Sequence, residues 1–251
     1  MMITRIVFSV LCLALVFSSS LVFGQLARKT QEVWPSIDVY YRINEKFRLY
    51  TTAGGTKKDS SNYTDGSLGV FLDFFSFPVL AKRREAHLEE LPGKYFRLRT
   101  GYQYTATPPN SEDPFQESLF VAQADWRYSL PYSVLFTFKN RFDFRFKGDD
   151  FSTRYRPRIH LEKDLHTDYL FFTASCFLEY YANFGQSDLN RFRFQLGLEF
   201  KVTKHINYET YWNHQFDHQP SIDAVDAFGM SLKFYLMSKN MKSALEKGQS
   251  K

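Results

Sequence analysis

Aromatic and charged residues alternate along much of the chain. In the stretch FTFKNRFDFRFK, residues 136–147, five of the six even positions are phenylalanine, and every odd position from 139 onward is charged. Because successive side chains of a β-strand point to opposite faces, this segment is expected to form a strand with one aromatic face and one charged face. Asn140 is the even position that departs from the pattern.

The same period of two recurs in about eleven segments, without a helical repeat of period 3.6. This pattern predicts an all-β, antiparallel fold. The predicted strands are residues 33–43, 47–53, 67–77, 95–105, 119–128, 134–147, 151–161, 169–181, 191–202, 206–216 and 227–236.

The predicted connections alternate between short and long. Short turns are expected at 44–46, 130–133, 163–168 and 204–205, and longer loops at 54–66, 106–115, 185–190 and 217–226. Short turns at one end and long loops at the other are typical of an up-and-down β-barrel of the outer-membrane type. Residues 78–93 are rich in helix formers and are expected to form a helical insertion between strands.

The N-terminus has the layout of a cleavable secretory signal. Arg5 precedes an apolar run at 6–17, and small residues follow up to Gly24. An uncleaved membrane anchor is the alternative reading. We therefore expect a signal peptide at 1–24, a barrel domain at 25–237 and a polar tail at 238–251. The mature chain would keep one cysteine, Cys176, and so could form no internal disulfide.

Two architectures fit strands that are apolar on one face and charged on the other. A water-soluble barrel or sandwich would bury the aromatic face, whereas a membrane barrel would turn it toward lipid. Several predicted strands run 11 to 14 residues, which suits a bilayer-spanning strand better than the shorter strands of soluble proteins. We therefore favour a membrane barrel of about 10–12 strands.

The strand count raises a question of parity, because single-chain bacterial barrels have even strand numbers. Eleven predicted strands leave two explanations: residues 26–32 add a short strand, or one predicted strand is surplus.

The polar faces together predict a basic lumen. Such a lumen would either favour small anions at a constriction or be a salt-bridged interior that fills a narrow barrel. The predicted lumen-lining residues are Arg97, Arg99, Asp125, Arg127, Lys139, Arg141, Asp143, Arg145, Arg154, Arg156, Arg158, Arg191, Arg193, Glu199 and Glu209.

Charge and motifs narrow the function further. The net charge of +5 allows nucleic acid, an anionic lipid surface or an anion pore as partner. Rings and guanidinium groups on opposite faces could not contact the same nucleic-acid strand, so we expect no nucleic-acid binding.

Outer-membrane lipid hydrolases carry a histidine followed by serine two positions later, and no histidine of this chain has that spacing. His160 with a serine from a neighbouring strand is the enzyme alternative that this leaves. No HExxH or CxxC spacing occurs, and we expect no metal, cofactor or catalytic site.

Six short segments carry a resemblance to one protein family: 31–38 (QEVWPSID), 63–66 (YTDG), 99–102 (RTGY), 140–143 (NRFD), 151–158 (FSTRYRPR) and 227–232 (AFGMSL). The chain is similar to exported bacterial proteins of domain-of-unknown-function family 2490 (DUF2490) over most of residues 31–236, and 154–158 (RYRPR) is the most specific part. The resemblance implies an outer-membrane-type β-barrel from a diderm (Gram-negative) bacterium, and no activity. The insertion near 80–91 departs from the family pattern. The tail beyond Leu236 departs too, because outer-membrane barrels usually end on an aromatic residue that the assembly machinery recognises.

The sequence thus predicts a porin-like outer-membrane β-barrel without enzymatic activity, either structural or passing small anions. Its expected partners are outer-membrane lipid, the outer-membrane assembly machinery and small anions. The alternatives are a soluble periplasmic β-barrel that binds an acidic or lipidic ligand and, third, an outer-membrane lipid hydrolase.

Overall fold

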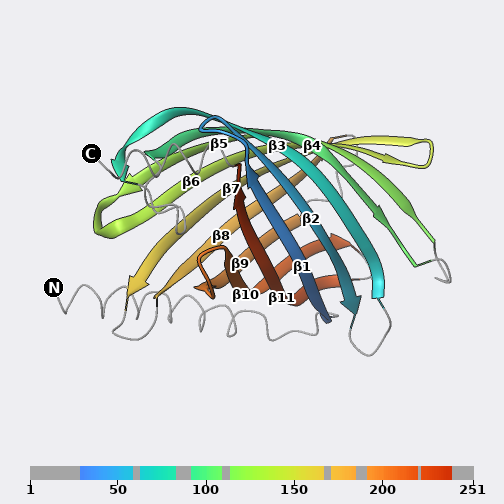
Figure 1. Cartoon of the computed structure of the whole chain (residues 1–251). Helices are drawn as coiled ribbons and strands as arrows, with labels where there is room; N and C mark the ends of the chain where they lie inside the picture. Colours follow the sequence, from blue (N-terminus) through green and yellow to red (C-terminus); the bar gives the residue numbers. More distant parts are fainter. Residues whose placement is uncertain are drawn as a thin grey trace.

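Eleven β-strands form a closed barrel in the computed structural model, which describes residues 29–58, 63–82, 92–108, 114–166, 171–184, 191–219 and 222–238 (Figure 1). The predicted all-β barrel is confirmed, and the strand count lies within the predicted range. The strands are β1 (Lys29–Arg42), β2 (Phe47–Lys58), β3 (Tyr63–Lys82), β4 (Pro92–Ala106), β5 (Gln116–Leu130), β6 (Val134–Lys147), β7 (Asp150–His166), β8 (Phe171–Phe184), β9 (Arg191–Lys201), β10 (Ile206–Gln219) and β11 (Ile222–Met237).

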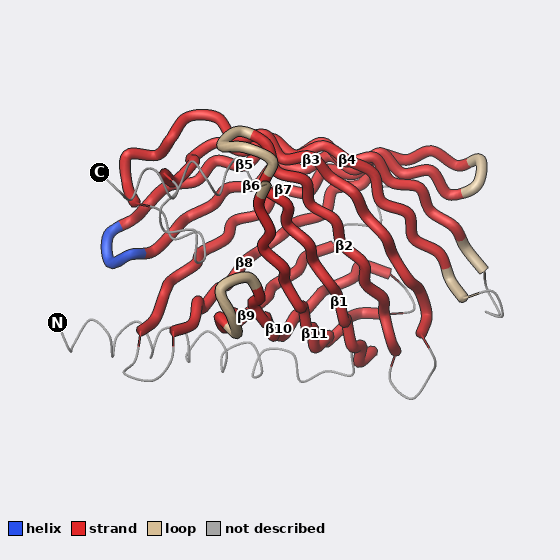
Figure 2. Tube along the Cα trace, viewed as in Figure 1, coloured by secondary structure: helices blue, strands red, loops and turns tan. Residues whose placement is uncertain are grey.

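Strand makes up almost all of the described chain, as the red tube of Figure 2 shows. The turn between β5 and β6 holds the single short 3-10 helix of the described residues, η1 (Pro131–Ser133). Tyr132 adopts a φ of 63° there, a left-handed conformation that a tight turn can impose on a residue other than glycine. None of the described segments forms a helix long and apolar enough to cross a membrane.

The barrel closes through a parallel strand pair. Neighbours from β1 to β11 pair antiparallel, but β1 and β11 run side by side in the same direction, with Lys29 opposite Ala224 and Arg42 opposite Met237. An odd number of strands can close when the first and last are parallel. Both explanations of the parity question were therefore wrong: residues 29–32 begin β1 itself, and no strand is surplus.

Parallel closure separates the two ends of the described chain. We call the end of the barrel at which β1 begins the N-terminal end, and the end at which β11 finishes the C-terminal end. Successive strands alternate in direction, so the β1–β2 turn lies at the C-terminal end and the β6–β7 turn at the N-terminal end.

The predicted alternation of short turns and long loops holds only in part. Strand β2 continues through Gly54, which pairs with Ser36 on β1 and Ser67 on β3, and ends at Lys58. Strand pairing likewise takes up most of the predicted loop at 217–226, since β10 and β11 reach Gln219 and Ile222. The glycine-rich part of β2 stays extended because strands on both sides satisfy its backbone hydrogen bonds.

Three predicted segments lie wholly or partly outside the described residues. Strand β3 extends to Lys82 and β4 begins at Pro92, so strand occupies the edges of the expected helical insertion, and 83–91 is not described. The expected signal peptide at 1–24 also lies outside, as does the expected tail beyond Ser238.

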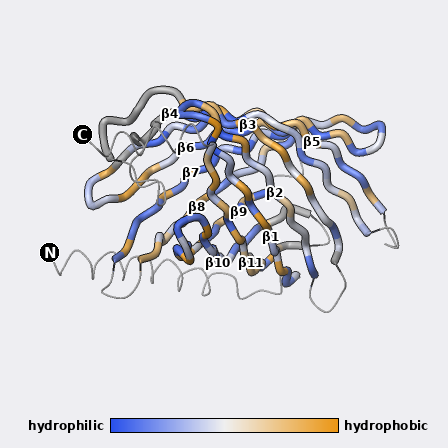
Figure 3. The backbone as a smooth tube through the Cα atoms, in the orientation of Figure 1, coloured by the Kyte–Doolittle hydropathy of each residue, from blue (hydrophilic) through white to orange (hydrophobic). Residues whose placement is uncertain are grey.

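Apolar side chains face outward and charged side chains face inward. Figure 3 shows the resulting alternation of hydrophobic and hydrophilic positions along the strands. Leu68 and Phe120 expose 60% and 52% of their surface on the outside, while Asp73, Asp125 and Asp143 are fully buried inside. This arrangement is the reverse of a water-soluble barrel, in which the apolar face is buried.

A small apolar cluster occupies part of the interior. Phe71, Leu119 and Val121 form it, with Tyr50 packed against them. The Phe71 ring lies against Gly101 on the neighbouring strand, where an added Cβ would come within 2.6 Å of that ring. Glycine at this position lets the ring lie flat against the inner wall.

Candidate functional site

The barrel interior holds the largest concentration of charged side chains. All fifteen predicted lumen-lining residues occupy inward positions of β4, β5, β6, β7, β9 and β10, on the same face as the buried carboxylates. They do not form one uniform lining. Twelve of them belong to three groups, each built around carboxylates. Arg145 pairs with Glu117 nearer the N-terminal end, Arg127 Nη2 lies 3.7 Å from Glu162, and Lys139 stands opposite Asp125 and Arg158 in the strand register.

The first group joins strands β2 to β5. Asp73 accepts hydrogen bonds from Arg48 (Nε at 2.9 Å and Nη2 at 2.8 Å) and from Arg99 (Nε at 2.6 Å and Nη2 at 3.0 Å). Arg97 binds Asp125, whose other oxygen accepts from Gln123 at 2.8 Å. Two fully buried carboxylates therefore hold three arginines against one wall, as buried charges require partners.

The second group spans β6 and β7. Asp143 accepts from Arg141 Nε at 2.5 Å, from Arg154 Nη2 at 2.8 Å and from Arg156 Nη1 at 3.2 Å. One carboxylate thus contacts three guanidinium groups. The charge around Asp143 remains positive.

Arg156 extends this group to β8 and β9. Its Nη2 donates to Glu179 at 3.0 Å, and Glu179 also accepts from Arg158 Nη2 at 2.9 Å. Arg193 Nη1 lies 3.9 Å from the same carboxylate. A second buried carboxylate is therefore also shared among three arginines.

A tyrosine ring stands at the centre of the second group. The Tyr181 ring, 2% exposed, lies under four guanidinium groups, and its hydroxyl accepts from Arg156 Nη2 at 3.0 Å. Arg193 is held between two rings, 5.1 Å from the centroid of Tyr181 and 5.0 Å from that of Trp34 on β1. Guanidinium groups stack favourably on aromatic faces. The four, by distance to the Tyr181 centroid, are Arg156 (4.4 Å), Arg154 (5.1 Å), Arg193 (5.1 Å) and Arg191 (5.6 Å).

The third group joins β9, β10, β11 and β1 and is the more acidic. Lys233 Nζ binds Glu199 at 2.6 Å and Glu209 at 2.9 Å. On β1, Asp38 accepts from Tyr50 Oη at 2.8 Å and from Ser231 Oγ at 2.6 Å. The charge of the interior is therefore uneven: arginines outnumber carboxylates in the first two groups, and carboxylates outnumber Lys233 in the third.

Sequence reasoning missed several members of these groups. Asp73 lies in a strand whose inward positions also include Phe71 and Phe75, and Arg48 is followed on its inner face by Tyr50, so neither strand showed a polar inner face in the sequence. Tyr181 resembled the aromatic residues of the outer face. The signal that could have found Tyr181 is its position: it lies two residues after the inward Glu179 in the same strand and therefore shares its face.

Histidine chemistry finds little support in the interior. His160 lies opposite Thr137 and Phe177 in the strand register, so neither direct partner is the serine of the enzyme alternative. Its Nδ1 is 3.9 Å from a Glu162 oxygen. Among the described residues, no group of three or more His, Cys, Asp or Glu side chains is placed to hold a metal ion.

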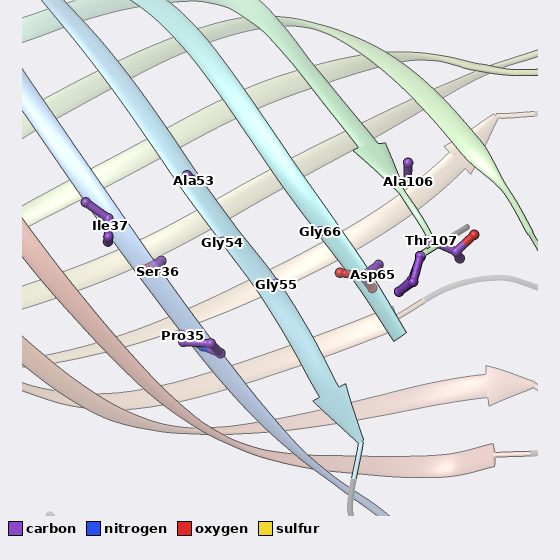
Figure 4. Close-up of a pocket in the computed structure, with 11 residues that line it drawn as sticks. Pro35, Ser36, Ile37, Ala53, Gly54, Gly55, Asp65, Gly66, Ala106 and Thr107 are labelled. Carbon is purple, nitrogen blue, oxygen red and sulfur yellow. The ribbon is translucent and has the colours of Figure 1, made fainter. Parts of the chain in front are cut away.

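A hollow of about 520 Å³ lies in the wall near the N-terminal end. Figure 4 shows its lining on β1, β2, β3 and the end of β4. Gly54, Gly55 and Gly66 thin the wall there, because glycine has no side chain. Asp65 is the one titratable residue of the lining, so the hollow offers little chemistry.

Comparison with protein families gives a match over most of the chain. The family model described as "Protein of unknown function (DUF2490)" matches residues 31–226, from the third residue of β1 into β11. No curated protein matches the chain.

Proposed function

This chain belongs to the DUF2490 family of proteins of unknown function, and we propose that it is a non-enzymatic β-barrel of the bacterial outer membrane whose basic interior receives small anions. The observation that carries the proposal is the reversed placement of apolar and charged residues. Apolar side chains are stable on the outside of a barrel when lipid surrounds them, and a charged inner face is typical of such barrels.

The outer face supports this proposal strand by strand. Along β5–β9, Lys163, near the C-terminal end of β7, is the single charged side chain among the outward positions of these described strands. On β7 the uncharged outward row runs from Phe151 to Leu161. Ten residues of a strand tilted by about 40° rise roughly 25 Å, close to the height of the apolar band of outer-membrane barrels.

The outer face also carries a polar pair near one end of the barrel. His214 Nδ1 lies 2.5 Å from Asp226 Oδ1 near the N-terminal end, beside the rings of Trp212 and Phe216. Aromatic and polar side chains together are characteristic of a membrane–water interface. An ion pair of this kind would be costly deeper in the hydrocarbon.

The anion preference rests on the arginine surplus of β6–β9. Arg141, Arg154, Arg156, Arg158 and Arg193 share two carboxylates, Asp143 and Glu179, as their ion-pair partners within the described strands. Such a wall attracts anions and repels cations.

Fractionation tests the membrane part of the proposal. The full-length chain, produced in a diderm host, should be recovered in the outer-membrane fraction and should migrate faster on a gel before heating than after heating. Recovery in the soluble periplasm would overturn the proposal and favour a soluble periplasmic barrel.

Planar-bilayer conductance tests the anion part. An open lumen should pass chloride in preference to potassium, with a reversal potential of the corresponding sign under a salt gradient. Cation preference would contradict the proposed role of the arginines.

A further inference from the structure

We propose that the arginines around Tyr181 form a binding site for a tetrahedral oxyanion such as phosphate or sulfate. We call Arg154, Arg156, Arg193, Tyr181 and Trp34 the Tyr181 cluster. The inference rests on the proposed function and deepens it, because it assigns the anions to one place in the interior.

The cluster is built before any ligand arrives. Arg156 is bound by both carboxylates, and Arg193 is held between the rings of Tyr181 and Trp34. Arg193 also donates from Nε and Nη2 to Gln215 Oε1, at 3.1 and 2.6 Å. Side chains fixed in this way lose little conformational freedom on binding, which favours affinity.

The cluster retains hydrogen-bond donors beyond those its carboxylates use. Arg154 binds Asp143 through Nε and Nη2, so within the described strands its Nη1 group is not used by that carboxylate. The Nε of Arg156 is buried and has no hydrogen-bond partner among the described residues. Arg193 directs its two hydrogen bonds to a neutral amide, so its charge is only partly compensated by Glu179 at 3.9 Å. An unpartnered buried donor is costly, and a bound anion would satisfy it.

The balance of charge favours an anion of more than one charge. Five arginines of β6–β9 meet two carboxylates, Asp143 and Glu179 (5 − 2 leaves three positive charges). The two carboxylates reduce the attraction without cancelling it. Guanidinium groups bind phosphate and sulfate through paired N–H donors, a geometry that chloride cannot match.

Calorimetry on the full chain in detergent micelles tests the inference directly. Inorganic phosphate is titrated at an ionic strength held constant with sodium chloride. The wild-type protein should bind phosphate, whereas Arg154→Gln and Arg193→Gln should each weaken binding about tenfold or more. Lys46→Gln removes the same charge from the exposed β1–β2 turn and should change the Kd less than about twofold.

A conservative variant guards against loss of folding. Arg193→Lys keeps the charge but not the paired donors, so its Kd should lie between those of the wild type and Arg193→Gln. Heat-dependent gel mobility reports whether each variant is folded.

Three results would overturn the oxyanion site. They are a folded wild type that does not bind phosphate, Arg154→Gln and Arg193→Gln variants that bind phosphate as tightly as the wild type, and a Lys46→Gln variant that weakens binding as much as those two variants do. Failure of the oxyanion site can be distinguished from failure of the proposed function. A protein found in the outer membrane without phosphate binding loses only this site, and a soluble protein that binds phosphate keeps the site but not the membrane assignment.

Discussion

Tyr155 donates a hydrogen bond from its hydroxyl to the side-chain oxygen of Asn140, with 2.5 Å between the two oxygen atoms. Both side chains lie on the outward face, and the Tyr155 ring packs against Phe142 with 4.9 Å between ring centroids. Asn140 is the polar exception in an otherwise aromatic row of β6. A neighbouring strand therefore supplies the partner that this polar group would require in the proposed lipid environment.

This pair should be energetically coupled in a bilayer. Asn140→Leu and Tyr155→Phe each leave the other polar group without its partner. The double variant should therefore destabilise the barrel less than the sum of the two single variants. We expect a coupling free energy of about 0.5–1.5 kcal/mol from urea unfolding in lipid vesicles. Asn140→Leu with Tyr180→Phe on β8 is the matched non-contacting pair and should be additive. Additivity in both pairs would show that the hydrogen bond contributes nothing.

Arginine on the outer face should be tolerated according to depth. Phe142 lies four positions further from the β6–β7 turn than Phe146, which pairs with Phe151. Phe142→Arg should cost about 2–4 kcal/mol of unfolding free energy in vesicles, and Phe151→Arg about 0–1 kcal/mol. Phe142→Leu separates the loss of the ring from the added charge. Equal costs at the two depths, or a stabilising Phe142→Arg, would argue against lipid around this face.

The shared carboxylates should be far more important for stability than peripheral ion pairs. Asp143→Asn leaves Arg141, Arg154 and Arg156 without their common counter-charge and should cost about 3–5 kcal/mol. Glu117→Gln removes the partner of Arg145, whose side chain is 28% exposed, and should cost less than about 1 kcal/mol. Denaturant unfolding of both variants measures the difference. Similar costs would mean that Asp143 is not the centre of its group.

Parallel closure predicts which turns share a side of the membrane. Single-cysteine variants at Glu45 and Asp149, made with Cys176→Ala, place a thiol at the C-terminal and N-terminal ends of the barrel. A membrane-impermeant maleimide should label one of them in intact cells and both after permeabilisation. Lys204→Cys, in the β9–β10 turn, should behave like Glu45→Cys. Labelling of Glu45→Cys and Asp149→Cys alike in intact cells would contradict a barrel that spans the membrane.

Strand alternation was enough to separate the two faces from sequence. It places Phe192 outward and Arg193 inward, and the structure has both there, with Phe192 40% exposed and Arg193 against Tyr181. The period-two pattern depends only on local backbone geometry, so a single strand reveals it. The barrel class and the approximate strand number follow from repeating this reading along the chain.

The pairing of charges could not be predicted in the same way. Arg156 contacts Asp143 and Glu179, which lie on the strands on either side of it. Which inward residues meet depends on the register of neighbouring strands, and the sequence of one strand does not contain it. Closure by a parallel pair was missed for a related reason, because it is a property of the whole barrel.

The seam between β1 and β11 has a consequence for how the barrel is completed. Hairpin turns fix the alignment of the other described neighbours, but no turn joins the first strand to the last. A slip of one residue at this seam would turn Leu232 toward the charged interior and Lys233 outward, so the sorting of polar and apolar residues, with the Ser231–Asp38 hydrogen bond, sets the alignment. Contacts between the two ends of a chain form late and slowly. Until they form, β1 exposes an unpaired edge that other chains could join, which makes closure the step at which aggregation competes with folding.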